Sequence, residues 1–149
     1  MDLEKLINDD IKAAMLSKDR EKLEALRAVK AAILLEKTKE AGSGEMTEEA
    51  SLKILQKLVK QRKDSAQIYQ SQNREDLANV ELFQLSVIEK YLPAQMSEED
   101  IRAIVKRIIN ETGASTVKDM GKVMGTASKE LAGKADNSTI AAIVRQLLG

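Results

Sequence analysis

The sequence of 149 residues contains no cysteine, no histidine and no tryptophan. A chain without cysteine cannot form disulfides, and without cysteine or histidine it lacks the usual zinc ligands. Catalytic machinery of the Ser–His–Asp or Cys–His kind is excluded as well, because its base is a histidine. An all-carboxylate Mg²⁺ or Ca²⁺ site is the one metal site that this composition leaves open, but no calcium loop of the D-x-[DN]-x-[DN]-G kind occurs. We predict neither a metal site nor a cofactor.

The chain also lacks an excess of charge and any long apolar run. Its 24 basic residues are balanced by 24 acidic ones, so nucleic-acid binding would depend on a local patch. No window approaches the roughly 20 apolar residues of a membrane span, and the N-terminal segment has no apolar signal-peptide core. We therefore expect a cytoplasmic protein with no membrane partner. Only Tyr69, Phe83 and Tyr91 are aromatic, so we expect no base-stacking platform for single-stranded nucleic acid.

Apolar residues recur at spacings of three and four along nearly the whole chain, which predicts an all-α protein without strands. Pro93, the only proline, cannot continue a helix and marks the best domain boundary. We predict a four-helix bundle over residues 1–93, followed by a three-helix bundle over residues 94–149. The glycine-containing stretch at 40–46, EAGSGEM, is expected to turn the chain between the second and third helices.

Capping residues mark the predicted helix ends. Thr47, Asn73 and Ser97 are expected to be the N-caps of the third, fourth and fifth helices, and Asp136 or Asn137 that of the last. The fifth helix is expected to stop at the glycine of position 113.

The segment 118–137, KDMGKVMGTASKELAGKADN, places glycine inside a predicted helix, where it costs about 1 kcal/mol relative to alanine. At about 100° per residue, Gly121 and Gly125 lie on a strip beside a stripe of lysines. The opposite face is the predicted core, formed by Val117, Met120, Met124, Ala127 and Leu131. Two interpretations are open: the strip packs closely against another helix, or a phosphodiester backbone approaches it while the lysines contact phosphates.

A second basic stretch lies in the third predicted helix. Its lysines form either a solvated face or a secondary phosphate patch: Lys53, Lys57, Lys60 and Lys63. Arg62 falls on the apolar seam, which favours a structural ion pair with Glu36 or Glu81; the alternative is that it orients a ligand carboxylate or phosphate. No convincing active site is visible in the sequence.

A series of motifs resembles the GatB/YqeY family, and most closely its stand-alone YqeY-like members. The motifs run in order over essentially the whole chain: KQRKDS, NREDLANVE, YLP, SEED, KDMGKVMG, GKAD and the terminal IVRQLL. The resemblance implies a four-helix bundle joined to a three-helix bundle. A similar module forms the tail of the GatB subunit of the glutamine-dependent aminoacyl-tRNA amidotransferase, where it is implicated in holding tRNA.

GatB's chemistry resides in a separate catalytic body, which this sequence lacks. The resemblance therefore implies a tRNA-associated binding module without catalysis of its own, acting alone or beside an aminoacyl-tRNA synthetase or amidotransferase, and with no DNA specificity. The alternatives are a carbon–nitrogen ligase subunit with glutamine as amido-N donor, and a protein–protein adaptor. On the first interpretation the nucleic-acid-binding residues are Lys118, Gly121, Lys122, Gly125, Lys129 and Lys134.

Overall fold

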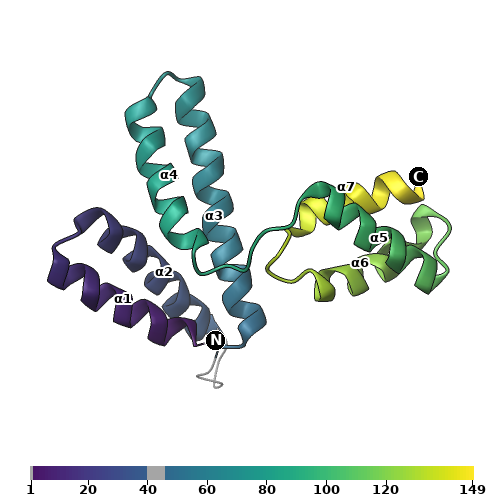
Figure 1. The fold of residues 1–149 in the computed structure, drawn as a ribbon, viewed down its shortest axis with the longest axis horizontal. Coiled ribbons are helices and arrows are strands. Elements are labelled where there is room, and N and C mark those ends of the chain that lie inside the picture. The colour runs from purple at the N-terminus through teal and green to yellow at the C-terminus, as the bar shows by residue number, and fades with distance from the viewer. Residues whose placement is uncertain (1, 40–45) are drawn as a thin grey trace. The chain divides into compact units, whose positions relative to one another are not determined.

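The computed structural model describes residues 2–39 and 46–149, and within these ranges it is helical without strands (Figure 1). The predicted all-α class is confirmed. The predicted turn at 40–46 lies, except for Met46, outside the described residues. No helix in the described ranges is long and apolar enough to cross a membrane. The elements are α1 (Leu3–Ser17), α2 (Arg20–Lys39), α3 (Glu48–Ser71), α4 (Glu75–Glu89), α5 (Glu98–Thr112), the 3-10 turn η1 (Val117–Asp119), α6 (Met120–Glu130) and α7 (Asn137–Leu148).

The chain forms two compact units, Met1–Leu92 and Pro93–Gly149. Pro93 begins the second unit, where its missing N–H and fixed φ prevent α4 from continuing. That each unit folds as an independent domain stays a prediction.

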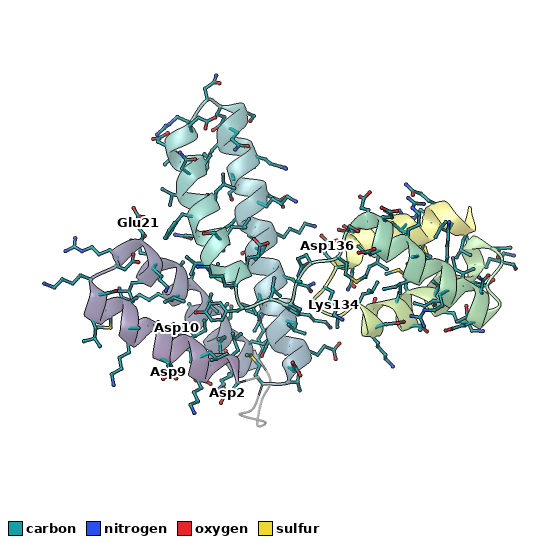
Figure 2. All side chains as sticks on the ribbon, viewed as in Figure 1. Asp2, Asp9, Asp10, Glu21, Lys134 and Asp136 are labelled. Atoms are coloured by element: carbon teal, nitrogen blue, oxygen red, sulfur yellow. The ribbon has the colours of Figure 1, made fainter. Side chains whose placement is uncertain are left out.

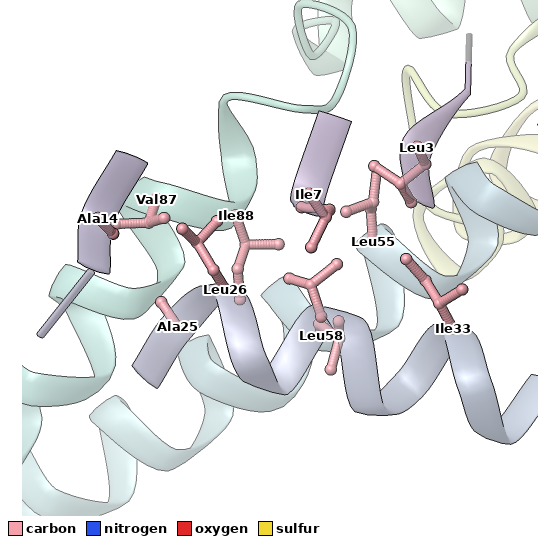
Figure 3. Close-up of a cluster of buried hydrophobic side chains, with 11 residues drawn as sticks. Leu3, Ile7, Ala14, Ala25, Leu26, Ile33, Leu55, Leu58, Val87 and Ile88 are labelled. Atoms are coloured by element: carbon pink, nitrogen blue, oxygen red, sulfur yellow. The ribbon is translucent and has the colours of Figure 1, made fainter. Parts of the chain in front are cut away.

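In the first unit the α1–α2 hairpin packs against part of the α3–α4 hairpin, mainly through α2 (Figure 1). The turn between α3 and α4 lies beyond the reach of α1 and α2. Figure 3 shows the core where the two hairpins meet. Its buried side chains are Leu3, Ile7, Ala14, Ala25, Leu26, Val29, Ile33, Leu55, Leu58, Val87 and Ile88.

Tyr91 ties the end of this unit to α1. Its half-buried hydroxyl donates a hydrogen bond to the carboxylate of Asp10, which Figure 2 labels on α1. Burial raises the pKa of the Tyr91 hydroxyl, and the hydrogen bond to the negatively charged Asp10 raises it further. The chain is thus fixed to α1 just before Pro93.

Most predicted caps are confirmed. The Thr47 hydroxyl accepts the Ala50 N–H at 3.1 Å, and the Ser97 hydroxyl accepts the Asp100 N–H at 3.2 Å. Asp136 is the N-cap of α7, where its carboxylate accepts the Thr139 N–H at 2.8 Å. Gly113 ends α5 in the left-handed region, with φ 70°.

The predicted N-cap at Asn73 is wrong. Helix α4 begins at Glu75 after Arg74, and Asn73 lies one residue earlier with φ 59°. Asparagine tolerates this left-handed conformation better than most residues. It therefore serves the tight α3–α4 turn and not the helix start.

In the second unit α5, α6 and α7 contact one another around a separate core. The prediction that Val117 belongs to this core is wrong, because its side chain is 50% exposed, and Val123 is buried in its place. The reason is the η1 turn: a 3-10 helix has about three residues per turn, fewer than an α-helix, so the residues before α6 point in directions other than those of a continuous α-helix. The buried residues are Ile101, Val105, Ile108, Val123, Ala127, Leu131, Ala135, Ile140, Ile143, Val144 and Leu148.

Candidate nucleic-acid interface

The candidate surface of α6 and its leading turn, called the α6 face below, carries Lys118, Gly121, Lys122, Gly125 and Lys129. The corner between α5 and α6 positions its first residue, Lys118. The Asp119 carboxylate accepts the backbone N–H of Ser115 at 3.0 Å and that of Thr116 at 3.3 Å. These two hydrogen bonds hold the pKa of Asp119 below its ordinary value, and the positive charge of Lys122 lowers it further. The ionised Asp119 therefore fixes the turn that presents Lys118.

The two glycines of α6 lie on its exposed side. A Cβ built on Gly121 or Gly125 would meet no other atom of the described residues within 4 Å, so neither α5 nor α7 of the same unit packs on them. Within this unit, the close helix packing of the first interpretation is therefore not seen at the described residues. An open, shallow depression lies over this strip, lined by Gly121, Lys122, Gly125, Thr126, Lys129 and Glu130.

The predicted cations of this unit fall into two groups. Lys118, Lys129 and Lys134 are exposed, and within residues 2–39 and 46–149 no hydrogen bond or ion pair engages their ammonium groups. Lys134 lies in the turn between α6 and α7 (Figure 2). Lys122 is different, because its Nζ donates to the backbone carbonyl of Thr112 at 3.2 Å.

The acidic residue that lines the depression is already paired. Glu130 forms an ion pair with Arg107 of α5, and Arg107 Nη1 also lies 3.5 Å from Glu111 Oε1. Because Arg107 compensates Glu130, the negative charge at this edge opposes the lysines less than the sequence suggests.

The secondary basic patch of α3 is exposed, as are all four of its lysines. Lys53 Nζ lies 3.4 Å from Glu49 Oε1, an exposed i,i+4 pair. A second shallow hollow brings Lys53 and Lys57 together with Glu36 and Glu49. Carboxylates thus lie among these cations, which makes the patch less suited to phosphate than the α6 face. Lys60 and Lys63 complete the patch.

Arg62 is half-buried between α3 and α4, but its partner is not the predicted carboxylate. Its Nε donates to Gln84 Oε1 at 3.1 Å, and its Nη1 donates to the Leu58 carbonyl at 3.2 Å. Among the described residues no ion pair joins it to Glu36 or Glu81. A neutral amide one turn along α4 from Glu81 satisfies the guanidinium instead.

Two features of the interface were missed from the sequence. The role of Asp119 could have been found, because Thr116 followed by Asp119 is an approximation of the capping-box pattern. The link from Lys122 to Thr112 could not, since it depends on the path of the chain through the α5–α6 corner. The only hint is that α5 carries no basic residue in its own last turn.

Comparison with known proteins agrees with the resemblance. The sequence matches the family described as "Yqey-like protein" over residues 4–148. It is 35% identical to "Altered inheritance of mitochondria protein 41, mitochondrial" of Clavispora lusitaniae, over 71% of this chain and 62% of that protein. The same-named proteins of Meyerozyma guilliermondii and Saccharomyces cerevisiae are 34% and 38% identical, over 78% and 70% of this chain and 63% and 57% of theirs.

These relatives also correct one expectation. Their names place them in mitochondria, which contradicts the cytoplasmic localisation expected from the sequence. That expectation rested on the lack of a signal-peptide core and of a membrane span, and neither feature tells the cytoplasm from an organelle. The chain spans about six tenths of the length of these relatives. Because the family match runs from residue 4 to residue 148, the chain belongs to the YqeY-like protein family.

Proposed function

We propose that this protein is a helical binding module that docks on the backbone of folded RNA, tRNA in particular, alone or beside an aminoacyl-tRNA synthetase or amidotransferase. One observation supports the proposal: no described residue of the second unit covers the strip of Gly121 and Gly125, and the neighbouring Lys118 and Lys129 are exposed, with no described partner for their ammonium groups. A helix surface without side chains lets another backbone come close, and lysine is a compact charge that attracts phosphate. The likeness to the GatB tail supports the same assignment.

The chemistry of the face favours a folded RNA over a single strand. Stacking of unpaired bases needs aromatic side chains, and α6 has none. Double-helical RNA is recognised mostly by shape, through phosphates and 2′-hydroxyls. The Thr126 hydroxyl lines the depression and donates to the Lys122 carbonyl at 3.4 Å, so it can accept a hydrogen bond from a 2′-hydroxyl. The face is thus suited to recognising shape and not sequence.

The experiment compares tRNA binding by the wild type with binding by two charge-reversed variants. Lys118→Glu/Lys129→Glu reverses the proposed face, whereas Lys5→Glu/Lys12→Glu makes the same charge change on exposed positions of α1. We expect the first variant to lose roughly tenfold or more in affinity at low salt, because phosphate contacts dominate such binding. The second variant should bind much like the wild type. Equal losses in both, or none in the first, would count against the α6 face; circular dichroism checks folding.

A protein–protein adaptor is the second candidate, and it depends on a different surface. Large apolar side chains are exposed along α3 and α4: Ile68, Val80, Leu82 and Phe83. Where such side chains form a contiguous apolar patch, they mark interaction sites in soluble proteins. Binding to a purified amidotransferase or synthetase that survives RNase, and that Val80→Glu/Phe83→Glu abolishes, would support this candidate. The carbon–nitrogen ligase alternative stays a prediction, which ammonia release from glutamine by the purified protein would support.

A further inference from the structure

Lys122 occupies a different environment from the other lysines of the α6 face. Its ammonium group reaches back across the α5–α6 corner and donates to the carbonyl of Thr112, the last residue of α5, at 3.2 Å. Its positive charge also acts on Asp119, whose carboxylate holds the same corner. Lys122 is therefore engaged by the protein on both sides of the corner.

The end of α5 gives a physical reason for this contact. The last carbonyls of a helix have no intrahelical partner, and a cation near them is favourable. The cap residue Gly113 and the next residue, Ala114, both direct their N–H groups to the Ile109 carbonyl, which leaves the Thr112 carbonyl to other donors. Helix α5 has no basic residue in its last turn, so Lys122 supplies that charge from α6.

Lys118 and Lys129 have no comparable engagement. Both are exposed, and no described residue accepts a hydrogen bond from their side chains or pairs with them. A phosphate that approached Lys122 would compete with the Thr112 carbonyl and would be repelled by the nearby Asp119. A phosphate at Lys118 or Lys129 meets no competing carbonyl.

We propose that Lys122 is a positioning residue that fixes the α5–α6 corner, while Lys118 and Lys129 are the lysines of α6 and its leading turn that contact phosphate. This division of roles rests on the proposed function, since only RNA binding gives the phosphate contacts a meaning. It deepens that function by separating two kinds of lysine that the sequence presents as one stripe.

The test measures two quantities on each single variant of the full chain: the thermal midpoint of unfolding and the salt dependence of tRNA binding. Lys122→Met is expected to lower the midpoint by about 2–4 °C and to leave the log–log salt slope unchanged, so that its binding line runs parallel to that of the wild type. Lys118→Met and Lys129→Met are expected to leave the midpoint unchanged and to reduce the slope by about 0.7–0.9 each. Lys122→Arg should restore the midpoint, because it retains the cation.

Lys106→Met is the matched control, since Lys106 is an exposed lysine of α5 outside this face. It removes one charge and should change neither quantity. A Lys122→Met variant that loses slope as Lys118→Met does, with an unchanged midpoint, would overturn the division. If the wild type binds no tRNA at low salt, the proposed function fails and the phosphate contacts fail with it. The positioning role would still be decided by the midpoints of Lys122→Met and Lys118→Met.

Discussion

Replacing the exposed glycines of α6 by alanine is expected to stabilise the fold and weaken RNA binding at the same time. A Cβ at Gly121 or Gly125 meets no other described atom within 4 Å, so the added methyl group clashes with none of the described residues. Neither glycine adopts a positive φ that alanine would avoid. The substitution should therefore recover the helix propensity that glycine forfeits.

The magnitude depends on position within α6 (Met120–Glu130). Gly125 is in the middle of the helix, so Gly125→Ala should raise the free energy of unfolding by about 0.7–1 kcal/mol. Gly121 lies in the first turn, where helices fray, and Gly121→Ala should give less, about 0.3–0.5 kcal/mol. Urea unfolding followed by circular dichroism measures both values. Unchanged or lower stability in Gly125→Ala would refute the claim that the position is uncovered.

The same two variants also test the close approach of a ligand. If an RNA backbone comes into van der Waals contact with the strip, two added methyl groups hold it away, and affinity falls although the protein is more stable. Binding that is unchanged in Gly121→Ala/Gly125→Ala would mean that the ligand does not touch the strip.

Three further predictions concern side chains that make hydrogen bonds. Asp119→Asn should lower the free energy of unfolding at neutral pH. Because the folded-state pKa of Asp119 is depressed, its contribution to stability is present above the ordinary pKa of about 4 and is lost as the pH falls through the folded-state pKa. In urea titrations at acid pH, the free energies of unfolding of wild type and variant should therefore converge. In a double-mutant cycle, Arg62→Met and Gln84→Leu should show a coupling of about 1 kcal/mol, whereas an additive result would contradict the hydrogen bond. Because the folded-state pKa of Tyr91 is raised, its contribution to stability is complete below pH about 10 and is lost as the pH rises further. The Tyr91→Phe variant should therefore lose less stability than the wild type at high pH, and ultraviolet titration of the wild type should show a late-ionising phenol that the variant lacks.

Helix type and most helix ends could be predicted from the sequence because they depend on local chemistry. The periodic spacing of apolar residues predicts where the helices lie. The caps Thr47, Ser97 and Asp136 accept hydrogen bonds from residues only three positions further along the chain. Asn73 was misassigned because asparagine suits both an N-cap and a left-handed turn, and the choice depends on how tightly α3 and α4 are joined.

The candidate site was predictable only in part. That the glycine strip lies away from the core follows from helical geometry. The core position expected for Val117 was wrong because residue spacing does not distinguish a 3-10 turn from an α-helix. The partners of Lys122 and Arg62 depend on which residues the tertiary fold brings near. Long, flexible side chains leave such pairings open in the sequence.

The most direct test of the central claim is the affinity of the unmodified protein for folded tRNA as a function of salt concentration. If Lys118 and Lys129 contact phosphates, the protein should bind tRNA at low salt, and these two residues should give a slope of log affinity against log salt concentration of about −1.4 to −1.8. The slope should be steeper if Lys134 also contributes. Binding that does not depend on salt, or no binding at low salt, would contradict the account.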